Sequence, residues 1–128
     1  MASKDLYHDI KVSQCIAAAT LSATTTGTAV DTQDYESVTF VINAGAGLSA
    51  DNKMTVSLVE GYASDTLTDV AAADYLNASF DIIATGVYKI GYRGVKRYVA
   101  VKLTETGTVS APMSAMAVLS SARIVPVA

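Results

Sequence analysis

The amino-acid sequence predicts an all-β protein, an antiparallel β-sandwich or jelly-roll-like barrel. Several short stretches alternate strictly between apolar and polar residues, which is typical of strands with one buried and one solvated face. Turn residues separate these stretches roughly every dozen positions, as in sandwiches and barrels. The 128 residues suit one domain with a core of its own, so we expect a single β-domain over residues 1–128.

The first part of the chain is the least decisive. Residues 1–9 are polar and are expected to form an extended N-terminal arm. Residues 9–21 are rich in alanine, so strand and helix compete; we predict a strand, because no helix would extend into the Ser/Thr/Gly loop 22–27. A short strand is expected over 28–30, before a turn at 31–33. The face assigned to the first strand is Val12, Gln14, Ile16 and Ala18.

The middle of the chain gives the clearest strands. Residues 36–43 are dense in β-branched residues, and 54–60 alternate just as regularly. Between them, residues 44–52 contain Gly, Ser, Asp and Asn and predict a flexible loop. Residues 61–69 are interpreted as turn-rich, and Thr68 or Asp69 is a suitable cap for one helical turn over 70–75.

The C-terminal part begins with a strand over 80–84. Residues 88–107, YKIGYRGVKRYVAVKLTETG, then predict two strands joined by a tight turn at Arg93 and Gly94, that is, a hairpin. A long final strand is expected over 113–125. The predicted core is Val38, Phe40, Ile42, Val56, Leu58, Ile90, Val99, Val101, Leu103, Val118 and Met116.

Composition limits the partners. Charged residues make up 16% of the chain, a low value that favours an assembled protein over a monomer. The net charge of −3 argues against nucleic-acid binding, and no apolar run is long enough for a membrane span. The densest basic group, Lys89, Arg93, Lys96, Arg97 and Lys102, forms a solvated face or meets an acidic partner. The start of the chain has no signal-like apolar region, so synthesis in a cytoplasm is expected.

The sequence contains no recognisable catalytic pattern. The single histidine, His8, lies in the polar arm, and the single cysteine, Cys15, lies in an apolar run that favours a buried, inert side chain. The acidic residues of 31–36 resemble turn residues more than a cation site. Ala44–Gly47 lacks the lysine and helix of a phosphate loop. We therefore expect no catalytic, cofactor or metal site, and an enzyme is the least supported class.

Several segments resemble a family of small tailed-bacteriophage virion proteins that are encoded near the major capsid gene. The resemblance rests on the Asp-Leu-Tyr-His opening at 5–8, the Thr-Gly-Thr-Ala-Val-Asp turn at 26–31, and the Ser-Val-Thr-Phe-Val-Ile strand that leads to Gly-Ala-Gly at 37–47. It continues with Leu-Val-Glu at 58–60 and Tyr-Arg-Gly-Val-Lys-Arg-Tyr-Val-Ala-Val at 92–101. The chain departs from the family in lacking a tryptophan near its middle loop, where residues 66–70 stand.

The resemblance implies a capsid decoration or cement protein on the virion surface. Its partner would be the major capsid protein, and a homo-oligomer, trimer or dimer, is expected. The predicted interface residues are Tyr7, His8, Tyr92, Arg93, Lys96 and Arg97. A tail-tube, tail-terminator or head–tail joining role is the alternative within the virion. A carbohydrate-binding β-sandwich, with Tyr88, Tyr92 and Tyr98 as a platform, is the alternative outside it.

Overall fold

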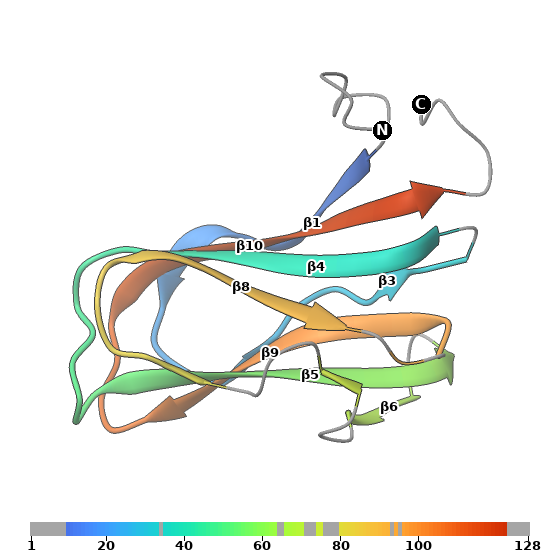
Figure 1. The fold of residues 1–128 in the computed structure, drawn as a ribbon. Helices are drawn as coiled ribbons and strands as arrows, with labels where there is room; N and C mark the ends of the chain where they lie inside the picture. The colour runs from blue at the N-terminus through green and yellow to red at the C-terminus, as the bar shows by residue number, and fades with distance from the viewer. Residues whose placement is uncertain are drawn as a thin grey trace.

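The computed structural model confirms the antiparallel β-sandwich (Figure 1). It describes residues 10–33, 35–63, 66–70, 74–75, 80–92, 94 and 96–122. Among these residues, no helix is long and apolar enough to span a membrane. The strands are β1 (Ile10–Leu21), β2 (Thr25–Thr26), β3 (Val30–Asp31), β4 (Tyr35–Ala44), β5 (Lys53–Ala63), β6 (Thr66–Asp69), β7 (Phe80–Ile82), β8 (Gly86–Tyr92), β9 (Tyr98–Thr106) and β10 (Ala111–Ala122).

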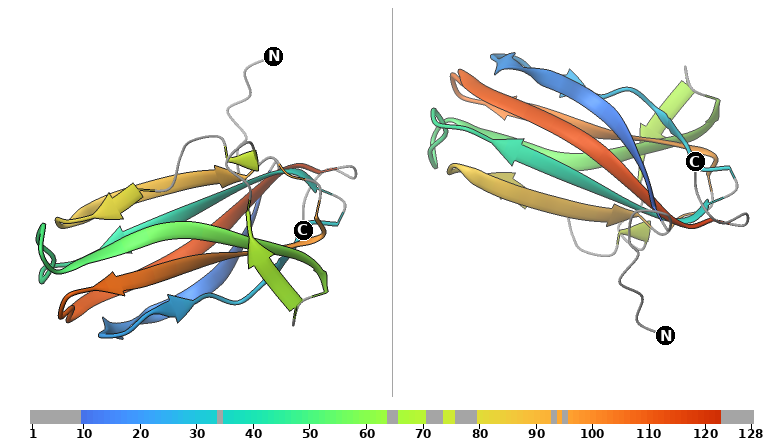
Figure 2. Two further views of the ribbon diagram at one scale, coloured as in Figure 1. Left: turned by 90° about the horizontal axis from the view of Figure 1, so that it is seen from below. Right: turned by 90° about the horizontal axis from the view of Figure 1, so that it is seen from above.

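Two sheets face each other across one core. Sheet A has the strand order β1-β10-β4-β8, and its four strands lie side by side in the right-hand view of Figure 2. Sheet B has the order β2-β9-β5-β6, with β3 also paired to β9 and β7 also paired to β5. All of these pairs are antiparallel. The short strands β2, β3, β6 and β7 therefore line both edges of the long β5–β9 pair, which limits edge-to-edge pairing by sheet B.

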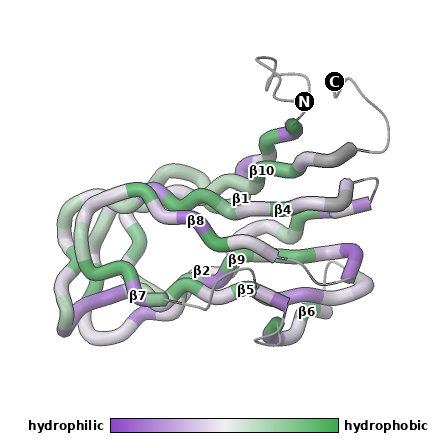
Figure 3. Tube along the Cα trace, viewed as in Figure 1, coloured by the Kyte–Doolittle hydropathy of each residue, from purple (hydrophilic) through white to green (hydrophobic). Residues whose placement is uncertain are grey.

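The core is built from alternate side chains of the long strands. Phe40 and Ile42 from sheet A and Leu58 and Val101 from sheet B have no exposed surface. Hydrophilic stretches are short along both sheets (Figure 3), in keeping with this burial. Nine predicted core residues are confirmed as buried: Val38, Phe40, Ile42, Val56, Leu58, Ile90, Val99, Val101 and Leu103.

The predicted hairpin is wrong, because its two strands belong to different sheets. β8 pairs with β4 in sheet A, whereas β9 pairs with β5 in sheet B. The segment between them crosses from one sheet to the other. The alternation predicted for β8 and β9 is confirmed, but alternation indicates only which face of a strand is buried, and the pairing partner is set by contacts distant in sequence.

The inward face of the last strand is also corrected. Met116 is 40% exposed and Val118 is only partly buried, whereas Met113 and Leu119 lie in the core. Both alternating sets of β10 contain apolar residues, so the local pattern does not distinguish them. Among the described residues, this strand begins at Ala111, two positions before the predicted start.

The first strand has a similar correction. Of the predicted face, Val12 is 54% exposed and Ile16 is buried. Cys15, which is not on the predicted face, is buried as well. The pairing of β1 with β10 shifts in register between Gln14 and Ile16 and again between Ile16 and Ala19. Each shift resets the alternation, so a single period-two face cannot describe the strand.

Two further differences concern short elements. The stretch expected to be turn-rich, 61–69, contains the end of β5 and the strand β6, and Val59 is buried beside that pairing. The loop expected at 22–27 contains β2. Residues 71–73 of the helical turn expected over 70–75 lie outside the described residues.

The two methionines of β10 provide a test of its register. Met113→Ala should lower the free energy of unfolding by about 2–5 kcal/mol, because it removes a side chain that is 2% exposed. Met116→Ala should cost less than about 1 kcal/mol, since that side chain already meets solvent. Urea unfolding of both variants at low protein concentration is the measurement, and the reverse order of costs would contradict the observed register.

Candidate interaction surfaces

The crossing from β8 to β9 is held by a buried tyrosine. The Tyr92 side chain is 5% exposed, and its hydroxyl donates a 2.6 Å hydrogen bond to Oε1 of Glu60, a buried carboxyl group on β5. The same hydroxyl accepts a 3.1 Å hydrogen bond from the backbone N–H of Lys96. Burial, reinforced by the Glu60 contact, raises the pKa of Tyr92 well above its ordinary value. The contact joins sheet A to sheet B and fixes the start of β9.

Two neighbours complete this arrangement. Tyr75 forms an isolated antiparallel bridge with Tyr92, and its hydroxyl accepts a 2.8 Å hydrogen bond from the Leu58 N–H. A Cβ atom at Gly94 would clash with the Tyr92 hydroxyl, so glycine is required for the close approach. The segment that carries Lys96 is therefore positioned by core contacts.

Beyond the crossing, the chain displays a group of side chains that we call the aromatic corner: Tyr62, Lys96, Arg97 and Tyr98. The Tyr62 ring is on a residue that is 68% exposed, and the Lys96 ammonium lies 4.0 Å from its centroid. The Arg97 guanidinium lies 5.1 Å from the Tyr98 ring centroid. Such cation–π pairs hold flexible cationic side chains over rigid rings.

Arg97 is also fixed by an ion pair. Its Nε and Nη2 atoms donate hydrogen bonds of 3.0 and 2.8 Å to the two carboxylate oxygens of Asp31. The Arg97 hydrogen bond is the main reason why the pKa of Asp31 is lowered from its usual value. Asp31 also accepts a 3.0 Å hydrogen bond from the Gln33 N–H, which is the turn role expected from the sequence.

The structure brings together some of the predicted interface residues. Lys96 and Arg97 are adjacent at the corner, where Tyr62 joins them although the sequence placed it in a turn. Tyr92 is buried and acts by positioning this segment. Tyr7, His8 and Arg93 lie outside the described residues.

The five basic residues grouped in the sequence do not form one patch. Lys89 is on the outward alternation of sheet A, and Lys102 is on that of sheet B, with Lys96 and Arg97 at the corner. These residues are close in the sequence, but the chain passes from sheet A to sheet B between them, so they lie on different surfaces.

A second surface is the outer face of sheet A, which we call the A face. Its members on the outward alternation of the four strands are Ile10, Val12, Gln14, Ser37, Thr39, Val41, Asn43, Val87, Lys89, Gly91, Ser114, Met116, Val118 and Ser120. Lys89 is the one charged side chain among them. Val12, Val87 and Met116 are 54%, 70% and 40% exposed, so apolar surface meets solvent on this face.

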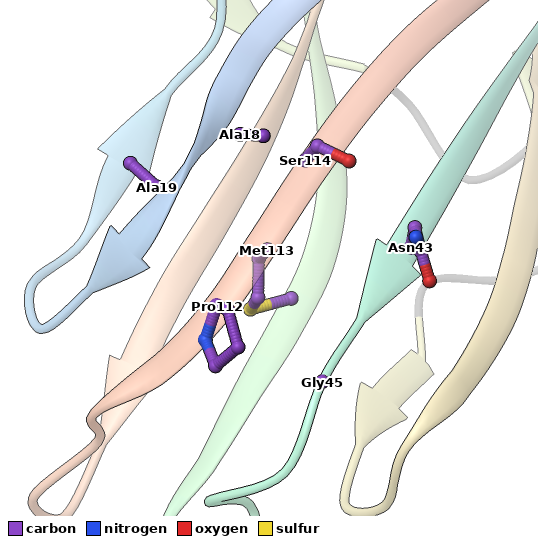
Figure 4. Close-up of a pocket in the computed structure, with 7 residues that line it drawn as sticks. All are labelled: Ala18, Ala19, Asn43, Gly45, Pro112, Met113 and Ser114. Carbon is purple, nitrogen blue, oxygen red and sulfur yellow. The ribbon is translucent and has the colours of Figure 1, made fainter.

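A hollow of about 220 Å³ lies at one end of the A face (Figure 4). Its lining comes from β1, β10, β4 and the residue after β4: Ala18, Ala19, Asn43, Gly45, Pro112, Met113 and Ser114. Ala18 lies within the second register shift of β1 and Ala19 at its end, and their small side chains line this part of the hollow. The hollow is largely apolar, with an amide and a hydroxyl at its rim.

Groups suited to metal or thiol chemistry are sparse in the described part of the chain. Among those residues, no three His, Cys, Asp or Glu side chains come together in a way that could hold a metal. Burial raises the pKa of the Cys15 thiol to about 11, so it stays protonated and unreactive near neutral pH.

No protein-family model matches the chain, and no curated protein matches it in sequence. Two solved structures share its fold. The chain superposes on the PBSX exported protein XepA with a TM-score of 0.63 and 13% identity, over 97% of this chain but 41% of that one. This chain therefore spans less than half the length of XepA. The SPBc2 prophage-derived protein YomS matches with a TM-score of 0.55 and 14% identity, over 88% of this chain and 94% of that one.

The Tyr92–Glu60 contact predicts a measurable stability cost. Tyr92→Phe should lower the free energy of unfolding by about 1–3 kcal/mol, because it leaves a buried carboxyl group without its hydroxyl donor. Tyr88→Phe is the matched control, since its hydroxyl donates to the Ala84 carbonyl at an exposed position, and should cost less. Equal costs for the two variants would contradict the role assigned to Tyr92.

The same contact sets an alkaline dependence. Because the folded pKa of Tyr92 is raised, its contribution to stability is fully present below the unfolded tyrosine pKa of about 10 and is lost as pH rises towards the folded value. Unfolding midpoints measured across alkaline pH should fall more steeply for the native protein than for Tyr92→Phe. Parallel curves would show that Tyr92 is not the group responsible.

Proposed function

We propose that this chain is a non-enzymatic structural protein of a phage particle, and specifically a capsid decoration protein that bridges major capsid protein subunits. The observation that carries the proposal is the aromatic corner. It offers an exposed tyrosine together with lysine and arginine side chains that are already held in place. Tyrosine and arginine are enriched among the residues that dominate protein–protein binding energy.

The fold supports the same proposal. YomS is a prophage-derived protein by name, and the sandwich that XepA and YomS share with this chain accounts for nearly all of its length. The start of β1 lies at the same end of the sandwich as the start of β9, where the corner is (Figure 1). Residues 1–9, with Tyr7 and His8, come directly before β1 in the sequence, and in the proposal this segment and the corner engage the shell together.

The physical effect of such binding is stabilisation by mass action. A protein that binds across the joint between two shell subunits binds the assembled head and not the separated subunits, so each bound copy favours the assembled state. Pre-positioned side chains reduce the entropy lost on binding. The hydrogen bond from the Lys96 N–H to Tyr92 and the ion pair between Arg97 and Asp31 provide this preorganisation.

The test is co-sedimentation of the purified protein with matched phage heads that lack it. Saturation at a copy number matching the repeated sites of the shell is the result expected for a decoration protein. Saturation at a few copies would move the assignment to the tail or the head–tail joint. No binding to any particle would overturn the virion role.

Corner variants make the test specific. Tyr62→Ala should weaken head binding roughly tenfold or more, as expected for an anchor residue at an interface. Lys96→Ala should weaken it less and reduce its dependence on salt. Lys102→Ala, on the outer face of sheet B, is the matched control and should bind like the native protein. Undiminished binding by Tyr62→Ala and Lys96→Ala would exclude the corner as the shell contact.

A further inference from the structure

We propose that the A face is a self-association surface, on which two copies of the chain pack face to face about a two-fold axis parallel to the strands. The first argument is charge. In a contact between identical faces, every charge on the face lies near the same charge of the second copy. The chain has 12 acidic and 9 basic residues, yet the A face as described carries Lys89 alone. A near-neutral face is suited to a copy of itself.

The strand order determines which residues would meet. An axis between β10 and β4 exchanges these two strands and also exchanges β1 with β8. One row across the sheet reads Gln14, Met116, Val41 and Lys89 in register. The rotation places Met116 of one copy against Val41 of the other, so apolar side chains meet at the centre.

The same rotation keeps Lys89, the one charged residue of the A face, away from its copy in the second chain. Each Lys89 faces the neutral amide of Gln14 on the other copy. The two Lys89 residues stand at opposite edges of the interface, three strand spacings or about 14 Å apart, which exceeds the screening length of about 8 Å in physiological salt. An axis across the strands would instead superpose β8 on β8 and bring the two Lys89 side chains to one edge. Charge therefore favours the axis along the strands.

Shape agrees with charge at the end of the face. Val87, 70% exposed, lies in register with Asn43 beside the hollow. The rotation carries Val87 over the β1 side of that end in the second copy, where Ala18 and Ala19 line the hollow. Val87 of each copy thus lies over the hollow of the other copy. The contact occurs twice in the dimer, as the two-fold symmetry requires.

The size of the face suits a modest dimer. Four strands at a spacing of about 4.8 Å and nine paired residues at about 3.3 Å each give a projected area of about 550 Å² per copy. This is just below the range of stable specific interfaces, which bury about 600–1,000 Å² per partner, and falls among weak ones. Facing sheets also pack with their strands roughly aligned, as this axis demands. A dimer that dissociates on dilution is the expected form.

The experiment is sedimentation velocity of the full chain over a wide concentration range, without phage heads. The native protein should change from monomer to dimer as concentration rises, and Met116→Glu should remain monomeric, because it buries a carboxylate against Val41. Ile83→Glu is the matched control: it places the same charge at a residue that is 47% exposed outside the A face, and it should dimerise normally. Thermal unfolding verifies that all variants fold.

A charge pair at the predicted contact gives a second test that misfolding cannot imitate. Gln14→Glu should tighten the dimer about two- to tenfold by pairing with Lys89 of the other copy, and salt should remove the gain. A zero-length carboxyl–amine crosslinker should then join Lys89 to position 14 between chains. Within one chain the two positions are on opposite edge strands, too far apart for that reagent.

The outcomes separate this proposal from the decoration role. A native protein that stays monomeric at every concentration overturns the A-face dimer, whatever the result of head binding. A dimer that survives Met116→Glu, or that Gln14→Glu does not tighten, overturns the proposed face or axis. Failure to bind heads leaves the dimer result unchanged, since the association is measured on the protein alone.

Discussion

The constraint on which the structure depends is the burial of alternate side chains between two sheets. Phe40 and Ile42 on β4 face Leu58 and Val101 on the opposite layer, and all four are fully enclosed. Once these side chains are inside, the intervening residues must point outward. The A face is therefore a direct result of the core, because Thr39 and Val41 occupy the positions between the buried members of β4.

The switch of the chain from sheet A to sheet B connects stability to the candidate interface. A tyrosine at the end of β8 reaches a carboxyl group in the middle of the other sheet, and its hydroxyl also fixes the backbone of Lys96. A contact that closes the core thus determines the position of Lys96, just before β9 begins. The same residues that stabilise the crossing position the aromatic corner.

The corner and the A face lie in different places on the sandwich. The corner is at one end, where β3, β5 and β9 meet, while the A face covers the broad side of the other sheet (Figures 1 and 2). Their chemistry differs as well: the corner combines rings with fixed cations, and the A face is almost uncharged. The two proposed contacts, one with the shell and one with a second copy, therefore use separate surfaces of the sandwich.

The sequence alone predicted the fold class and most of the inward faces of β4, β5 and β9, because residues such as Val38, Val56 and Val99 alternate with polar neighbours and periodicity is a local property. It also predicted that Cys15 is buried, from its apolar run.

Only the tertiary structure determined the pairing of β8 with β4, since partners are chosen by contacts far apart in the chain. It also decided the face of β10, where Met113 and Met116 belong to opposite sets that are both apolar. The same holds for the place of Tyr62, which meets Lys96 only because β5 and β9 are neighbours. Local patterns say which side of a strand is buried, and the arrangement of strands decides which surfaces result.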